Sequence, residues 1–260
     1  MEIAEHIDAL RRQGDSLADA AEQAGLDAAV PPCPSWQVRD LLRHTGYIHR
    51  WATRHVAECP DHVLDGPPEE EILRGGAPDP DLLDWFRVGH VALVETLTAA
   101  DPALECATFM PAPSSLAFWA RRQAHETAIH RADAESAAGK IPEYLAGFAA
   151  DGIDELITGF GRRRKYQPAA GPGTDGGLLR VVATDTGDTW SVEAHEGHLQ
   201  PRRGTGGNAP DGAGCTVSGA ASSIYLYLWN RLDAGRADVT VTGDDGMLAL
   251  WQASVRVRWS

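Results

Sequence analysis

The sequence predicts an α plus α+β protein in which an N-terminal four-helix bundle precedes a small C-terminal α+β domain. The first 165 residues contain four long segments whose apolar residues recur at helical intervals. Residues 166–177 are then rich in proline and glycine, which is typical of a linker. Beyond them, short strand-like runs appear among further helical segments. We therefore expect a bundle at 1–165, a linker at 166–177 and a second domain at 178–260.

The first two predicted helices are separated by a proline-rich break. Apolar residues recur with helical spacing across residues 2–24, which favours an amphipathic helix there. Prolines at 31, 32 and 34 interrupt this pattern. Ser35 is a favourable N-cap residue, so a second helix is expected over residues 36–57.

A long loop leads to the third long helix. Residues 59–80 are rich in proline, glycine and acids, which indicates a loop with one short helix at 69–73. Asp79 or Asp81 then begins a helix, which the Asp-Pro pair at 101–102 ends.

The fourth helix is predicted from Ser114 or Ser115 to Ala138, with Gly139 as the residue that ends it. A fifth helix at about 145–163 leads out of the bundle. It ends in a basic run that we interpret as a solvated last turn, where cations favour the helix dipole.

The second domain is predicted to mix strands and helices. The first two predicted strands are joined by a turn of Asp, Thr and Gly residues, so they form a hairpin. The predicted strands are 178–183, 189–194, 215–218 and 238–242, and the predicted helices are 220–232 and 244–255. Residues 204–214 are rich in glycine but lack the lysine of a phosphate-binding loop, so they indicate a flexible connection.

Composition excludes several classes of partner. The chain has 23 Lys and Arg against 37 Asp and Glu, a formal charge of −14. Such an acidic protein is a poor ligand for nucleic acid or for an anionic membrane. No basic, apolar leader opens the chain, and no apolar segment is long enough for a membrane span. The four cysteines form no CxxC pair, which is typical of a reduced protein, so we expect a cytoplasmic location.

The most informative residues are Glu126 and His130. They are four residues apart in the predicted fourth helix, so both side chains lie on one helix face. A carboxylate and an imidazole so placed are two thirds of a His2Glu metal site, and His44 in the second helix offers a third ligand. The same spacing also occurs as an ordinary solvated helix pair, an interpretation that the pair alone leaves open.

This pattern differs from the zinc-protease motif HExxH. His125 and His130 are five residues apart, which places them about 140° apart around a helix and does not suit one metal ion. The pair that fits a metal is therefore Glu126 with His130.

Several segments together resemble one family. They are CPSWQVRDLLRH at 33–44, HETAIHRADAE at 125–135, FAADGIDEL at 148–156, VSGA at 217–220 and LYLWNR at 226–231. In this order they resemble the mycothiol-dependent maleylpyruvate isomerase family of the DinB-like metalloenzyme superfamily. The resemblance covers nearly the whole chain and implies a DinB-like fold for the bundle.

The resemblance also implies a site. Zinc or another divalent ion would be held by His44, Glu126 and His130, with mycothiol, the small thiol of actinobacteria, as cosubstrate. Arg231 is the expected catalytic residue from the second domain, because a guanidinium suits a carboxylate substrate. Arg74, from the long loop, is a second candidate for that role.

The expected chemistry follows from a thiol activated by the metal. A thiolate adds reversibly to an activated double bond, which gives isomerisation, or it stays attached to the electrophile, which gives S-transfer. The metal ligands do not distinguish these two reactions. The alternative from another class is a non-catalytic bundle that binds a metal or small molecule. Asp133 and Glu135 are expected to support Arg131 or the helix surface.

Overall fold

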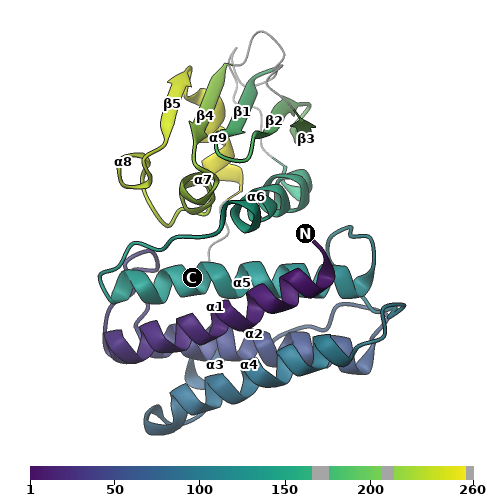
Figure 1. Ribbon diagram of the computed structural model, residues 1–260, viewed down its shortest axis with the longest axis vertical. Coiled ribbons are helices and arrows are strands. Elements are labelled where there is room, and N and C mark those ends of the chain that lie inside the picture. Colours follow the sequence, from purple (N-terminus) through teal and green to yellow (C-terminus); the bar gives the residue numbers. More distant parts are fainter. Residues whose placement is uncertain (166–175, 206–213, 256–260) are drawn as a thin grey trace. The chain divides into compact units, whose positions relative to one another are not determined.

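The structure is a computed structural model that describes residues 1–165, 176–205 and 214–255. Its contacts divide the chain into two compact units, Met1–Pro142 and a second unit that begins at Glu143 (Figure 1). The second unit therefore begins before the helix predicted at 145–163. Most of the predicted linker, 166–177, lies outside the described residues, as does most of the predicted glycine-rich connection.

The first unit is a four-helix bundle with one added short helix. Helices α1, α2, α4 and α5 form a ring in which α5 packs against α1 and α2, and α4 packs against the same two helices. This arrangement confirms the predicted bundle. The helices are α1 (Ile3–Ala24), α2 (Val38–Glu58), α3 (Glu69–Arg74), α4 (Leu82–Ala99) and α5 (Ser115–Ala137), with a 3-10 turn at Asp79–Asp81.

Helix α2 begins later than predicted. Its N-cap is Gln37, whose backbone N–H donates to Asp40 at 2.9 Å and whose side chain accepts in return, as in a capping box. The predicted cap at Ser35 was wrong because Trp36 is buried in the apolar core before the helix begins. Burial of a large aromatic side chain outweighs the preference of one serine for a cap.

The limits of α5 are close to the prediction. Ser114 is its N-cap, and the hydroxyl accepts the backbone N–H of Ala117 at 3.1 Å. Gly139 follows the helix with a positive φ of 76°, which glycine adopts without steric cost. The helix that carries Glu126 and His130 is thus defined at both ends by its sequence.

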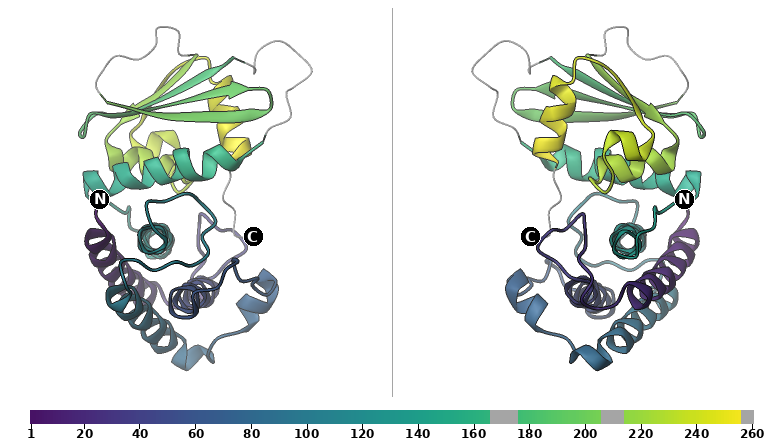
Figure 2. Two further views of the ribbon diagram at one scale, coloured as in Figure 1. Left: turned by 90° about the vertical axis from the view of Figure 1, so that its right-hand side faces the viewer. Right: turned by 90° about the vertical axis from the view of Figure 1, so that its left-hand side faces the viewer.

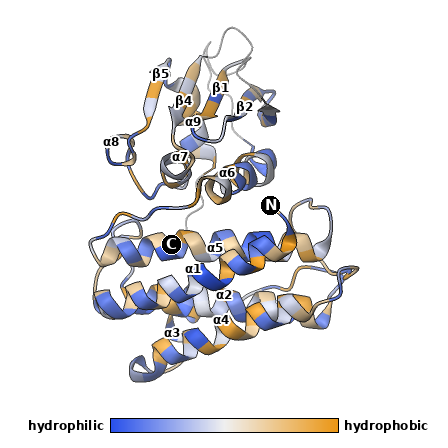
Figure 3. Cartoon of the chain, in the orientation of Figure 1, coloured by the Kyte–Doolittle hydropathy of each residue, from blue (hydrophilic) through white to orange (hydrophobic). Residues whose placement is uncertain are grey.

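An apolar core holds the bundle together. Leu17 from α1, Leu41 from α2, Phe86 from α4 and Ala134 from α5 belong to one fully buried cluster. Burying each large side chain contributes about 1.5–3 kcal/mol. Hydrophobic and hydrophilic residues are interspersed along these helices, as Figure 3 shows. None of the helices in the described ranges is long and apolar enough to cross a membrane.

The second unit contains a five-stranded sheet in the order β3-β2-β1-β4-β5. The central pair, β1 and β4, is parallel, and the other pairs are antiparallel. Strands β1, β2, β4 and β5 confirm predicted strands, whereas β3 was missed. The strands are β1 (Leu178–Ala183), β2 (Asp188–His195), β3 (His198–Thr205), β4 (Cys215–Gly219) and β5 (Thr240–Gly243).

Helices cover one side of this sheet. Helices α6 and α7 pack together, and α9 packs against β1 and β4 (Figure 2). A π-helical turn, Glu155–Phe160, and a 3-10 turn, Gly161–Arg163, continue α6 and complete the predicted fifth helix. The helices are α6 (Ala146–Asp154), α7 (Ala221–Leu228), α8 (Ala234–Ala237) and α9 (Gly246–Ser254).

Candidate metal centre

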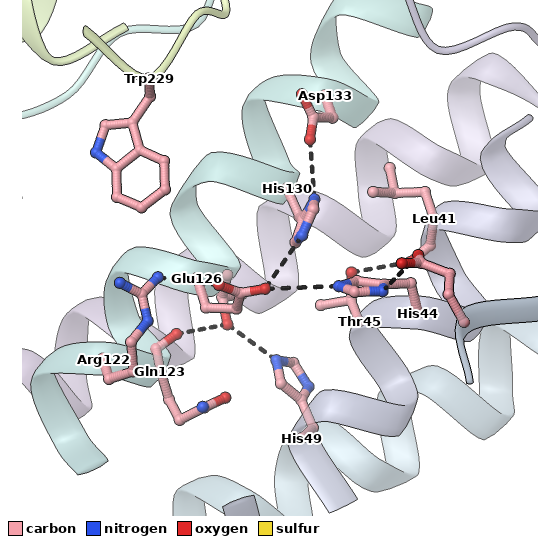
Figure 4. A network of polar contacts seen from close by, with 12 residues as sticks. Leu41, His44, Thr45, His49, Arg122, Gln123, Glu126, His130, Asp133 and Trp229 are labelled. Atoms are coloured by element: carbon pink, nitrogen blue, oxygen red, sulfur yellow. Dashed lines mark hydrogen bonds and ion pairs between the residues drawn. The ribbon is translucent and has the colours of Figure 1, made fainter. Parts of the chain in front are cut away.

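The structure brings together the three residues proposed as metal ligands. His44 comes from α2, and Glu126 and His130 come from successive turns of α5 (Figure 4). One nitrogen or oxygen atom of each lies within 4.8 Å of the others. All three side chains are buried. A distant residue and a helical pair therefore converge inside the bundle.

The distances between these atoms suit a metal ion. Glu126 Oε1 is 3.2 Å from His130 Nε2 and 3.6 Å from His44 Nε2. Two ligands bound tetrahedrally at about 2.0–2.1 Å from zinc are themselves about 3.4 Å apart. The observed separations bracket that value, and they lie at or beyond the usual length of an N–H···O hydrogen bond. The donor set thus fits a divalent cation.

His125 is directed away from this group, as its spacing predicted. Its ring lies against His6 of α1, with the ring centroids 6.1 Å apart. A five-residue offset on α5 places His125 and His130 on different faces.

A carboxylate supports each of the two histidines. Asp133 Oδ2 accepts from His130 Nδ1 at 2.8 Å, and both side chains are fully buried. Glu69 Oε1 of α3 lies 3.4 Å from His44 Nδ1. Each imidazole therefore has Nε2 beside Glu126 and Nδ1 beside a second carboxylate, and for His130 the hydrogen bond to Asp133 is the arrangement that orients a metal-binding histidine.

Asp133 is not on the helix surface, as one predicted alternative had it, because its side chain is fully buried beside His130. It lies one turn after His130, on the same face of α5, so helical spacing was a signal for this role. Glu135 does contact Arg131, with 3.3 Å between the charged atoms.

Arg122 holds the second oxygen of Glu126. Its Nη2 donates to Glu126 Oε2 at 3.0 Å, and both side chains are almost fully buried. This leaves Oε1 directed at the two histidines. The carboxylates of Glu69, Glu126 and Asp133 outnumber this guanidinium by two, an excess that a divalent cation would balance.

The ionisation states agree with this picture. Burial alone would raise the pKa of Glu126, but contacts with His130, His44 and Arg122 hold it well below the usual carboxyl value. Burial would likewise lower the pKa of His130, but Asp133 and Glu126 raise it above that of an ordinary histidine. These carboxylates favour the protonated ring, so a metal ion at Nε2 would compete with a proton there.

Trp36 forms an aromatic wall beside the histidines. Its ring centroid lies 5.0 Å from that of His44 and 6.1 Å from that of His130, with the latter pair stacked. Because Trp36 is almost fully buried, it shields the site from water on this side.

His49 and His90 are packing residues of the bundle core. His49 Nε2 donates to the hydroxyl of Thr127 at 2.9 Å, since that hydroxyl itself donates to the carbonyl of Gln123. Burial and the neighbouring His90 hold the pKa of His49 well below its usual value, so it is neutral. The rings of His49 and His90 are 5.3 Å apart, and His90 takes no part in the three-residue group.

The predicted arginines lie elsewhere in the chain. Arg231 belongs to the second unit, just after α7, and its Nη1 donates to the carbonyl of Trp229 at 2.8 Å. Its catalytic role stays a prediction. Arg74 ends α3 with a largely exposed side chain that contacts Glu70 at 3.2 Å.

Comparison with known proteins gives a consistent result for both units. The family model described as the mycothiol maleylpyruvate isomerase N-terminal domain matches residues 7–135. The model described as the MDMPI C-terminal domain matches residues 147–250. No curated protein sequence matches this chain.

Solved structures share the fold across both units. The crystal structure of the mycothiol-dependent maleylpyruvate isomerase matches with a TM-score of 0.61 and 16% identity over 93% of each chain. A histidine-to-alanine variant of such an enzyme matches with a TM-score of 0.63 and 14% identity over 93% of each chain. Together with the two family domains in order, this similarity shows that the chain belongs to the mycothiol-dependent maleylpyruvate isomerase family.

Proposed function

We propose that this protein is a metal- and mycothiol-dependent enzyme that isomerises, or transfers the thiol to, a small electrophilic substrate. The observation that carries the proposal is the convergence of His44, Glu126 and His130 inside the family's N-terminal domain. The family match favours this function over a non-catalytic binding bundle.

The residues of the chain have distinct roles in this proposal. His44 and His130 offer Nε2, and Glu126 offers Oε1, to a divalent ion, of which zinc suits the donor set best. Arg122 keeps the second oxygen of Glu126 occupied, so the carboxylate provides one ligand atom. Three protein ligands leave a position open for a thiol.

A thiol held at this open position would lose its proton more readily beside a divalent ion, and would so become a nucleophile at neutral pH. The thiolate would add to one carbon of an activated double bond, which becomes a single bond. Rotation about that bond and loss of the thiolate would then restore the double bond in the other configuration. Both reactions need a substrate carbon that accepts an electron pair. We expect the cytoplasm as the compartment, because the thiol has to remain reduced.

Arg231 is proposed to bind a carboxylate of the substrate. A guanidinium forms paired hydrogen bonds with a carboxylate, whereas lysine offers a single point charge. An Arg231→Lys variant that retains its metal but has a raised KM for an acidic electrophile would support this role. An unchanged KM would reject it.

The first test is metal content. Elemental mass spectrometry of the purified wild type is expected to give about one divalent ion per chain, as three convergent ligands predict. His44→Ala, Glu126→Ala and His130→Ala should each lose most of it while far-UV circular dichroism keeps the helical signal. Full occupancy in all three variants would reject the ligand assignment.

The second test separates the enzyme from a binding protein. Metal-loaded and metal-free protein are mixed with mycothiol and with maleylpyruvate or another activated alkene, and both isomer and thiol adduct are measured. Turnover that requires both metal and thiol supports the proposal. Equal behaviour with and without metal would favour the non-catalytic bundle.

A further inference from the structure

Residues 60–75, which we call the strap, run back along α2 in the opposite direction. Trp51 Nε1 donates to the carbonyl of Leu64 at 2.9 Å, and the Leu64 N–H donates to His55 Nε2 at 2.9 Å. One turn earlier on α2, Tyr47 lies so close to Gly66 that a Cβ there would be 2.9 Å from its hydroxyl oxygen. Successive turns of α2 thus hold successive positions of the strap in reverse order.

The far end of the strap is attached to the residue that precedes His44. Arg43 Nε donates to the carbonyl of Gly75 at 3.2 Å, and its Nη2 contacts Asp79 at 2.6 Å. Helix α3 lies within the strap and has no buried residue of its own. Its partly buried Leu73 packs against the core cluster of the bundle, and polar contacts between the strap and α2 add to this packing.

Glu69 is the point where the strap reaches the candidate metal centre. Its Oε1 lies 3.4 Å from His44 Nδ1, and the His44 side chain is 2% exposed. The Oε1 atom is shielded from solvent and forms no hydrogen bond within the described residues. A buried carboxylate oxygen in this situation is costly unless a positive charge lies beside it.

Three glutamates follow one another here, and their surroundings differ. Glu70 is 82% exposed and contacts Arg74 at 3.2 Å, on the outside of α3. Glu71 is exposed as well. Since adjacent helical residues point in different directions, the acidic run places one carboxylate at His44 and leaves the next two in water.

A cation bound to His44 would polarise its ring and so offset the cost of burying the Glu69 oxygen. A cation at Nε2 makes the Nδ1–H of the same ring a stronger donor, and a carboxylate at Nδ1 makes Nε2 a better ligand. The two effects are reciprocal, as any coupling between binding free energies has to be.

We propose that Glu69 is a positioning residue for His44 and that, through it, binding of the metal ion and docking of the strap stabilise each other. The proposal rests on the metal site of the proposed function. It adds to that site a residue of the strap, a surface segment that is far in sequence from Glu126 and His130.

The test compares Glu69→Gln with the matched control Glu70→Gln. Zinc affinity is measured by competition with a chromogenic chelator at fixed pH. We expect Glu69→Gln to weaken zinc binding about 10- to 100-fold, as other carboxylates behind metal-binding histidines do. Glu70→Gln should bind zinc as the wild type does. Thermal unfolding of the metal-free proteins establishes that both variants are folded.

Hydrogen exchange provides a readout that a merely structural role would not change. In the wild type, zinc is expected to slow exchange both in peptides of the strap and in peptides of α5. In Glu69→Gln at saturating zinc, protection should persist in α5 and be lost from the strap.

The outcomes separate this inference from the proposed function. Equal zinc affinity and equal strap protection in Glu69→Gln and the wild type would overturn the role of Glu69 and leave the metal site intact. A wild type that binds no divalent ion would overturn both. If Glu69→Gln is unfolded, Glu69→Asp replaces it as the test variant. It retains the charge, but its shorter side chain moves the carboxylate away from His44, so we expect zinc affinity to fall by less than 10-fold and strap protection by zinc to weaken. Strap protection equal to that of the wild type would count against the proposal.

Discussion

Arg122 and Glu126 form a buried charge pair one helical turn apart in α5. A buried pair contributes little net stability by itself, because both ions lose their hydration. Removing one partner has a larger effect, since the other charge is then isolated in a medium of low polarity. The stability of the bundle therefore depends on whether a positive charge lies beside the buried Glu126 carboxylate.

Replacing Arg122 tests this dependence. Arg122→Met is expected to destabilise the metal-free protein by about 3–5 kcal/mol, because Glu126 loses its buried counterion. Zinc should restore more stability in this variant than in the wild type. Urea unfolding with and without zinc measures both effects.

Arg54→Met is the matched control, since Arg54 pairs with Glu58 at the same helical spacing, with 2.9 Å between the charged atoms, on an exposed surface. Solvent screening makes such a pair weak, so no measurable change is expected. Equal losses in the two variants would contradict the account of the buried pair.

Asp133 supports a second prediction at this scale. Asp133→Asn keeps the shape of the side chain but removes the charge that holds His130 Nδ1. Zinc affinity is expected to fall about 10- to 100-fold. Glu135→Gln, which alters a contact with Arg131 on the same helix, should leave it unchanged. A loss in both variants would point to a general effect of charge near α5.

The sequence indicated the proposed ligands more readily than the carboxylates and the arginine that contact them. Glu126 and His130 were found because one helical turn joins them, and the same spacing leads to Arg122 and Asp133. Glu69 had no such signal. It belongs to a surface segment whose path along α2 depends on contacts made by the folded bundle.

Close packing between elements is visible at Gly14, where α1 meets α4. A Cβ at this position would lie 2.2 Å from the ring of His90. Gly14 lies within the α-helix α1, so its backbone conformation does not call for glycine. The lack of space for a side chain is what favours glycine here. A methyl group at residue 14 would therefore require the buried ring of His90, or the helix that carries it, to move.

Gly14→Ala is accordingly expected to destabilise the protein by about 1–3 kcal/mol, the usual effect of overpacking a core. Gly147→Ala, in α6, is the control because a Cβ there meets no atom within 4 Å. Helix propensity predicts that this control is neutral or slightly stabilising. Urea denaturation compares the two, and an undisturbed Gly14→Ala variant would show that α1 and α4 adjust freely.

His55 makes the attachment of the strap sensitive to pH. Its Nδ1 donates to the carbonyl of Trp51 at 2.8 Å, and its Nε2 accepts from Leu64. Only the neutral ring can do both. Burial, opposed in part by the bond to Trp51, lowers the pKa of His55 below its ordinary value.

The sign of the pH effect follows from that shift. The unfolded chain takes up the proton first, so the contribution of His55 is complete above about pH 6.5 and is lost as pH falls. In metal-free protein, the thermal midpoint should therefore drop less between pH 7.5 and 5.5 in His55→Gln than in the wild type. His62→Gln, on the exposed part of the strap, should show the wild-type profile. Parallel profiles for all three proteins would exclude this contribution.

Local patterns predicted the elements well where one signal dominated. The limits of α5 follow from Ser114 and Gly139, and β1 was predicted at its observed residues. Strand β3 was missed because Pro201, two arginines and a glycine obscure its alternation. Antiparallel pairing with β2 over its whole length defines this strand, and the sequence of β3 alone gives no sign of that pairing.

At the scale of the whole molecule, the three proposed ligands all belong to the first unit. Composition suggested a boundary at 166–177 because proline and glycine gather there. The compact units divide earlier, with the second beginning at Glu143, and within that unit α6 packs with α7. Contacts between distant residues decide this boundary, and they leave no mark in local composition.

Metal binding is therefore expected to stabilise the two units unequally. A ligand at 100 times its Kd stabilises the state that binds it by about 2.7 kcal/mol. Hydrogen exchange under increasing urea should show this gain in peptides of α1 and α5, with a smaller one in β1 and β2. An equal gain in both units would show that they unfold as one cooperative body.

The parallel pairing of β1 with β4 has a consequence for how the second unit forms during synthesis. Strands β1, β2 and β3 leave the ribosome together and can pair through short turns, whereas β4 follows only at Cys215–Gly219. Until then β1 is an edge, although the finished sheet buries Leu179 and Val181 at its centre. Exposed apolar edges invite pairing with other chains. Pairing of β4 with β1 therefore removes an edge that the nascent chain exposes while only its first three strands are complete.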